Sequence, residues 1–335
     1  MYLRSKGPDV GSVLAELASN VKDRSNEVNI FLNHIGEYEV FNPFHTGALP
    51  AFNGIDEPIG SKFFWERLGI CHLISNSSQN VFPMEDDWHI ENRKKDTIPF
   101  GWQHLKNDAV IDELKTVISG CTIIQFADWA NVDDASNLWN GFYCDVIKPL
   151  NKRDFQFIFH IGDTTKKLVF EVDEILDIIS DYSSYGRVTL VLEKDEADKL
   201  WCRLGGQESD GFLLFPETQG AKEKYFFLFN TMHIDALLIL HSNDVMLFSR
   251  DWQFDLIGKA LDSTQKSMYA WKGFETGYQL GLLLNLKIPL CIALGLAVAG
   301  IHSEHTSPHD SKVLLSYIND WMAELLARGC SSDMN

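Results

Sequence analysis

The stretch that decides the predicted fold covers residues 155–204 and reads FQFIFHIGDTTKKLVFEVDEILDIISDYSSYGRVTLVLEKDEADKLWCRL. Phenylalanine occupies every second position over 155–159, which predicts a strand with one buried aromatic face. Gly162 and Asp163 then supply turn residues. Apolar residues alternate again over 168–172, so we expect a second strand that pairs antiparallel with the first.

The second half of this stretch predicts two helices on either side of a strand. Asp173 is a candidate N-cap for a helix with apolar residues at helical spacing, and Gly186 is expected to end that helix. Residues 188–192 are almost all apolar, which is typical of a strand with both faces covered. Asp195 is expected to cap the second helix, which ends at Gly205.

The fold class that these patterns predict is α+β, with a mostly antiparallel central sheet over about residues 155–250 and helices packed from the N- and C-terminal regions. Residues 1–148 are expected to be a helical or irregular, aromatic-rich region, and residues 149–335 an α+β core with C-terminal helices. One core shared by both parts is the alternative. The other expected elements are strands at 121–126, 211–215, 225–230, 236–241 and 245–249, and helices at 8–22, 108–119, 131–146, 251–261, 264–284 and 311–327.

Composition and charge indicate a folded, acidic protein. The chain has 335 residues, a hydrophobic content of 45% and a formal net charge of −18, values that fit a folded acidic protein. An acidic surface repels phosphate backbones, which argues against nucleic-acid binding, and it attracts basic proteins. The six cysteines form no CxxC pair, and Cys202 and Cys291 lie in apolar contexts. We therefore expect reduced thiols and, since no secretion signal is visible, a cytoplasmic location.

The most apolar run of the chain covers residues 280–301 and is long enough for a bilayer. Lys287 near its centre is costly in a membrane, and Pro289 breaks the backbone hydrogen-bond ladder. We interpret the run as two buried helices, 278–286 and 290–299, or as one kinked helix, in a soluble core. Membrane insertion is the alternative.

Three histidines follow this run in the segment IHSEHTSPHD, namely His302, His305 and His309. Imidazoles at this spacing can converge on a transition metal if the segment folds around it. The alternative is a solvated loop in which Asp310 caps the next helix.

A second candidate site is an acidic cluster around a tryptophan. Its members are Glu85, Asp86, Asp87, Trp88 and Glu91. Tryptophan is a common anchor of protein interfaces, and flanking carboxylates favour a basic partner. A solvated acidic loop is the alternative.

A third candidate is the turn that carries His160 and Asp163, with Glu171 further along the chain. A histidine and a carboxylate can act as a base and the group that orients it. Ordinary turn chemistry also explains Gly162 and Asp163. The chain has no GxSxG, GxxxxGK[ST], HExxH or EF-hand motif, which removes the commonest nucleotide-binding and zinc-protease interpretations.

The function that these features predict is a soluble, non-enzymatic protein-binding module whose acidic surface engages a basic partner. A toxin-neutralising immunity protein is one concrete form of this hypothesis. The alternative is a metal-dependent hydrolase that uses the three histidines. No cofactor is expected, apart from a transition metal under that alternative.

Overall fold

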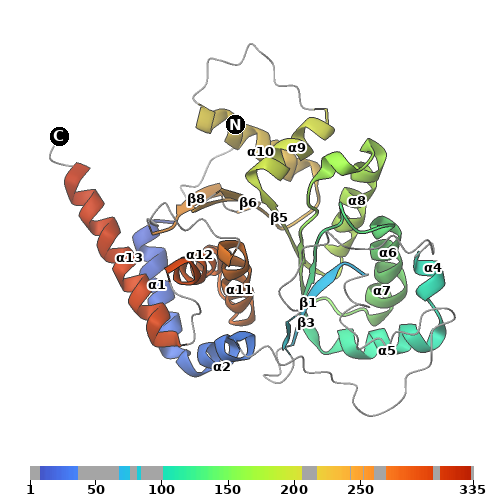
Figure 1. The fold of residues 1–335 in the computed structure, drawn as a ribbon, viewed down its shortest axis with the longest axis horizontal. Coiled ribbons are helices and arrows are strands. Elements are labelled where there is room, and N and C mark those ends of the chain that lie inside the picture. The colour runs from blue at the N-terminus through green and yellow to red at the C-terminus, as the bar shows by residue number, and fades with distance from the viewer. Residues whose placement is uncertain are drawn as a thin grey trace. The chain divides into compact units, whose positions relative to one another are not determined.

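The computed structural model describes residues 8–36, 68–75, 81–83, 101–205, 217–241, 243–251, 253–259, 269–304 and 310–332 (Figure 1). Its strands are β1 (Ile70–Ser75), β2 (Val81–Pro83), β3 (Cys121–Phe126), β4 (Phe155–Phe159), β5 (Gly186–Glu193), β6 (Ala236–His241), β7 (Asp244–Ser249) and β8 (Gln253–Ile257). Its α-helices are α1 (Val10–Asp23), α2 (Ser25–Gly36), α4 (Trp102–Leu105), α5 (Asp108–Ser119), α6 (Ala135–Phe142), α7 (Lys148–Leu150), α8 (Val169–Tyr182), α9 (Lys194–Arg203), α10 (Glu217–Thr231), α11 (Tyr269–Leu283), α12 (Ile288–Glu304) and α13 (Ser311–Ser332). A π-helical turn, Tyr143–Ile147, joins α6 to α7, and a 3₁₀ turn, Thr164–Lys166, precedes α8.

The strands of the described residues form one sheet in the order β2-β1-β3-β4-β5-β6-β7-β8. β1 pairs antiparallel with β2 and β3, whereas β4 pairs parallel with both β3 and β5. The expected mostly antiparallel sheet is therefore wrong, and the fold is α/β with a mixed sheet. The physical reason is the crossover: α6 lies between β3 and β4 in the chain and α8 between β4 and β5, and helical connections of this kind join parallel strands.

The incorrect prediction of an antiparallel sheet rested on residues 168–172, which form no strand. Leu168 is the N-cap of α8, and Glu171 accepts a hydrogen bond from the Leu168 amide at 2.8 Å. Leu168, Val169 and Phe170 are exposed over 60%, 47% and 65% of their surfaces. These three consecutive apolar residues therefore lie at the exposed start of a helix, not on the buried face of a strand.

In two further segments the structure differs from the prediction: a helix replaces an expected strand, and a strand lies within an expected helix. Residues 225–230 lie in α10, where Tyr225, Leu228 and Phe229 are buried at helical spacing. Within the expected helix 251–261 the structure has strand β8, in which Phe254 and Leu256 are buried at alternate positions. Gly186 opens β5 and does not end a helix. The strand expected at 211–215 lies outside the described residues.

Other predicted elements are confirmed, with shifts of a few residues at their ends. The strands at 121–126, 155–159, 188–192, 236–241 and 245–249 correspond to β3, β4, β5, β6 and β7. The helices at 8–22, 108–119 and 311–327 correspond to α1, α5 and α13.

The chain divides into two compact units. The first comprises Met1–Tyr38, Leu240–Leu247 and Asp251–Asn335, and the second Glu39–Ile239 with Phe248–Arg250. In the second unit, aromatic residues of β3 and β4 form the core with α6 and α8. Phe126 stacks on Phe159 at 4.8 Å between ring centroids, and the Tyr182 ring lies edge-on to both, at 5.5 and 5.2 Å. The Tyr182 hydroxyl donates to the Trp139 carbonyl at 2.7 Å.

The first unit contains helices α1, α2, α11, α12 and α13 together with most of β7 and all of β8, and the apolar run lies inside it. α11 packs along α12, and α13 along α1. Leu290, Ile292 and Leu294 are all buried, which confirms the interpretation of 280–301 as buried helices. No helix in the described ranges is both long and apolar enough to cross a membrane. Gly277 of α11 lies directly against Leu294 and Gly295 of α12, so glycine lets these two helices approach closely.

Candidate functional site

The candidate site lies within the second unit, where β3, β4 and β5 end. Because the three strands are parallel neighbours, their carboxyl ends, Phe126, Phe159 and Glu193, lie at the same edge of the sheet. Ligands of open α/β sheets bind outside this edge. The polar side chains described below come from the loop after β3, from the turn after β4 and from helix α9, which follows β5 directly.

The loops after β3 and β4 are held together by backbone and side-chain hydrogen bonds. The His160 amide donates to the Phe126 carbonyl at 2.9 Å, and the Ala130 amide donates to the Ile161 carbonyl at 3.0 Å. Lys166 donates through Nζ to Oδ1 of Asn131 at 2.6 Å. These bonds fix one loop against the other at the sheet edge.

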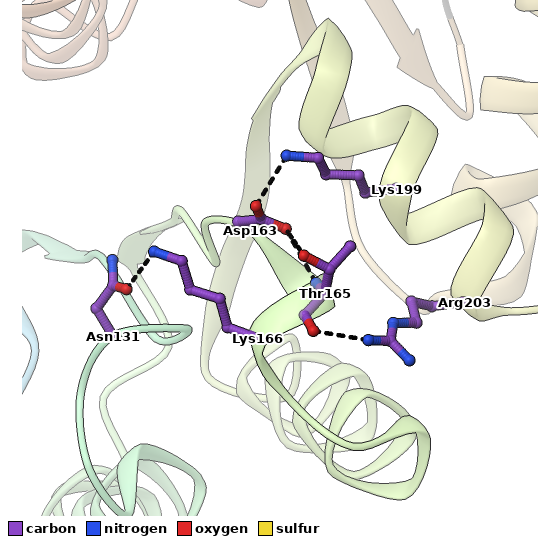
Figure 2. A network of polar contacts seen from close by, with 6 residues as sticks. All are labelled: Asn131, Asp163, Thr165, Lys166, Lys199 and Arg203. Carbon is purple, nitrogen blue, oxygen red and sulfur yellow. Dashed lines mark hydrogen bonds and ion pairs between the residues drawn. The ribbon is translucent and has the colours of Figure 1, made fainter.

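Asp163 is the centre of the polar network in Figure 2. Its Oδ2 accepts from Nζ of Lys199 at 2.8 Å, and its Oδ1 accepts from both the amide and the hydroxyl of Thr165, at 3.0 and 2.6 Å. Arg203, one turn beyond Lys199 on α9, donates to the Thr165 carbonyl at 2.7 Å. The hydrogen bond from Lys199, followed by those from Thr165, lowers the pKa of Asp163 from 3.8 to about 2.

A histidine–carboxylate pair joins the end of β4 to the start of α9. Nε2 of His160 lies 2.9 Å from Oε2 of Glu196, and both side chains are largely buried. The same Glu196 oxygen accepts the Glu193 amide at 2.9 Å, which caps α9. Burial alone would raise the pKa of Glu196, but the hydrogen bond and charge of His160 outweigh it and hold that pKa below its ordinary value.

The turn between β4 and α8 has two further unusual features. Gly162 has a φ of +73°, a conformation that favours glycine. Thr164 is fully buried, and its hydroxyl oxygen has no hydrogen-bond partner in the described part of the chain. Lys167 donates to the Val132 carbonyl at 3.2 Å and lies 5.4 Å from the centroid of the Trp129 ring. The Lys167 side chain therefore holds this turn against the loop after β3.

The arrangement suits proton transfer and the binding of a polar ligand. Desolvation and the neighbouring Glu196 raise the pKa of Glu193, while Lys199 keeps the Asp163 carboxylate ionised. The described residues contain no group of three or more His, Cys, Asp or Glu side chains placed to hold a metal ion. The pairs of His160 with Glu196 and of Asp163 with Lys199 supply acid–base and electrostatic chemistry at this edge.

In the structure, His160 and Asp163 have other partners than the sequence suggested. Both lie at the candidate site, but His160 pairs with Glu196 and Asp163 pairs with Lys199. Glu171 instead caps α8. Sequence reasoning missed Glu196, Lys199 and Arg203. Their spacing at i, i+3 and i+7 on one helix was visible, but without the parallel pairing of β4 and β5 nothing directed that face toward the turn after β4.

The other two predicted sites are largely outside the described residues. This applies to Glu85, Asp86, Asp87, Trp88 and Glu91, and to His305 and His309. His302 is described and lies half-buried near the end of α12. The metal and interface assignments of these residues stay predictions. Asp310 accepts the Lys312 amide at 3.0 Å, as expected of the cap of α13.

No protein-family model matches the chain, and no curated protein is similar to it in sequence. Solved structures do resemble it at low identity. A ribokinase from Thermotoga maritima is 13% identical, with 61% of this chain and 59% of that chain covered and a TM-score of 0.40. An adenosine kinase from Trypanosoma brucei brucei is 13% identical (61% and 56% covered, TM-score 0.45), as is one from Sinorhizobium meliloti (66% and 58%, TM-score 0.43). The matches thus span less than two thirds of those chains.

These comparisons correct the functional interpretations drawn from the sequence. The similar structures are sugar and nucleoside kinases, which are enzymes. The non-enzymatic protein-binding module, with the immunity protein as its concrete form, is therefore wrong. The alternative, a hydrolase built on the three histidines, stays untested, because His305 and His309 lie outside the described residues.

Proposed function

We propose that the chain is an enzyme that acts on a small polar molecule bound at the carboxyl edge of β3, β4 and β5. One observation carries the proposal. The loop after β3, the turn after β4 and helix α9 after β5 contribute polar side chains that contact one another, through Asn131 and Lys166, Asp163 and Lys199, and His160 and Glu196. Ligand sites of open α/β sheets lie at this edge.

Within this site we assign proton transfer to His160. Its imidazole is bonded to a buried carboxylate, which is the arrangement of a base and its orienting group. Glu196 is then a positioning residue. Lys199 keeps the Asp163 carboxylate ionised, so that Asp163 can accept a hydrogen bond from a ligand hydroxyl or amine.

The first activity to test is phosphoryl transfer from a nucleoside triphosphate to a sugar or a nucleoside. Purified full-length protein is mixed with a panel of sugars and nucleosides, first to find compounds that raise its thermal unfolding temperature. The compounds that bind are then assayed for release of nucleoside diphosphate.

His160→Gln tests the assigned role, with His233→Gln as its matched control because His233 is exposed and outside the network. Loss of a general base lowers kcat by roughly 10²–10⁴-fold, so we expect that loss in His160→Gln and none in the control. Glu196→Gln should lower kcat with KM unchanged, since it acts through His160. A panel without any binder, or full activity in His160→Gln, contradicts the proposal.

A cytoplasmic location also remains a proposal. Cys121, Cys144 and Cys202 are free thiols, with Cys121 buried and Cys202 exposed. Fractionation of cells that produce the tagged full chain tests it, and recovery from an oxidising compartment would count against it.

A further inference from the structure

We infer that the hydroxyl of Thr164 is a ligand contact of the proposed site, and this inference rests on the proposed function. Thr164 is the first residue of the 3₁₀ turn that follows Asp163, five residues beyond the end of β4. It lies between two residues of the network, Asp163 and Thr165, which bond to each other. None of the hydrogen bonds described at the site involves the Thr164 hydroxyl.

The reason for singling out Thr164 is an unmet hydrogen bond. The residue is 0% exposed, and its oxygen has no partner among the residues that the structure describes. A buried hydroxyl without a partner destabilises the folded protein, because folding removes the water that it bonds in the unfolded chain. Buried polar groups are nearly always paired, so each exception calls for an explanation.

Packing alone does not explain a threonine at this position. Valine has almost the same shape and carries no group that needs a hydrogen bond, so it would fill the same space without the cost. The neighbouring Thr165 shows the ordinary use of a threonine in this turn, since its hydroxyl donates to Asp163 at 2.6 Å. The Thr164 hydroxyl is therefore best accounted for by a partner that arrives with the ligand.

A ligand contact at Thr164 requires that the turn can move, and the side-chain bonds that hold the turn allow this. Because Thr164 is fully buried, a ligand reaches its hydroxyl only when the turn moves. On its surface side the turn is held to the loop after β3 by two side-chain hydrogen bonds, from Lys166 to Asn131 and from Lys167 to the Val132 carbonyl. On the side of α9, Lys199 and Arg203 hold Asp163 and the Thr165 carbonyl. All four bonds come from long, flexible side chains, so they can break without disturbing the strand pairing.

Thr164→Val tests the inference because it deletes the hydroxyl and keeps the volume. Without ligand, we expect its unfolding temperature to rise by about 2 °C or more, since an unsatisfied group is removed. The matched control is Thr165→Val, whose hydroxyl is bonded, and its unfolding temperature should fall. A fall in Thr164→Val as well would mean that the hydroxyl already has a partner in the free protein, which would overturn the inference.

The second measurement uses the sugar or nucleoside that the binding panel identifies. Thr164→Val should bind it about fivefold to tenfold more weakly, as expected for the loss of one hydrogen bond. Unchanged affinity in Thr164→Val, together with activity that depends on His160, rejects the inference and leaves the proposed function intact. A panel without any binder rejects both.

Discussion

Asp163 shows how a single side chain organises the turn at the end of β4. It accepts hydrogen bonds from Lys199 of α9 and from Thr165, and these lower its pKa from 3.8 to about 2. A carboxyl whose pKa is depressed by folding stabilises the folded state above its unfolded pKa. That contribution is lost as the pH falls through the folded value.

We therefore expect Asp163→Asn to be less stable than the parent chain above about pH 4, by an amount that shrinks toward zero as the pH approaches about 2. Urea unfolding of both proteins at a series of pH values measures the difference. A gap that stays constant down to about pH 2 would show that the hydrogen bonds to Asp163 do not depend on its charge.

Phe126 is the residue on which the aromatic core of the second unit depends most. Its ring centroid lies 4.8 Å from that of Phe159, 5.1 Å from that of Trp139 and 5.5 Å from that of Tyr182. Phe126→Ala should lower the free energy of unfolding by about 3–5 kcal/mol, because it removes buried aromatic surface and leaves a cavity. Denaturant titration measures this loss. Phe227→Ala is the control, since Phe227 is 48% exposed, and it should cost no more than about 1 kcal/mol.

Elements with one clear periodicity were predictable from the sequence, and α1 and α5 illustrate the reason. Each has an amphipathic stripe, and each begins at a capping side chain, Asp9 or Asn107, that accepts an amide of its first turn. The start of α8 and the end of α10 were misread because alternating or β-prone residues there are compatible with a strand. Their helical state is set by what they pack against, and periodicity over six residues does not carry that information.

The contact between α11 and α12 gives a prediction at the scale of elements. A Cβ atom at Gly277 would lie 2.5 Å from the Leu294 carbonyl oxygen and 2.8 Å from the Gly295 Cα atom. Because these are backbone atoms, Gly277→Ala must push the helices apart. We expect a loss of about 1–3 kcal/mol in the free energy of unfolding, measured by denaturant titration. Gly120→Ala is the control, since its nearest neighbour would be the Val117 carbonyl oxygen at 3.5 Å, and a loss there of similar size would contradict the explanation.

At the scale of the whole molecule, the chain divides into two compact units. One contains the buried helices α11 and α12, and the other contains the buried aromatic residues of β3 and β4. Units with their own cores can open separately. We expect Phe126→Ala to speed native-state hydrogen exchange in β3 and β4 and to leave the amides of α11 and α12 protected. Equal acceleration in both units would mean that the molecule unfolds as one.

The sequence by itself determined most of the helices, the central strands, the burial of 280–301 and the turn that holds His160 and Asp163, because each of these depends on local spacing and on the chemistry of neighbouring residues. Only the tertiary structure decided that β4 pairs parallel with β3 and β5, and therefore that Glu196, Lys199 and Arg203 of α9 reach the turn after β4. The direction of strand pairing depends on contacts between residues far apart in the chain. A single sequence contains no local signal for such contacts.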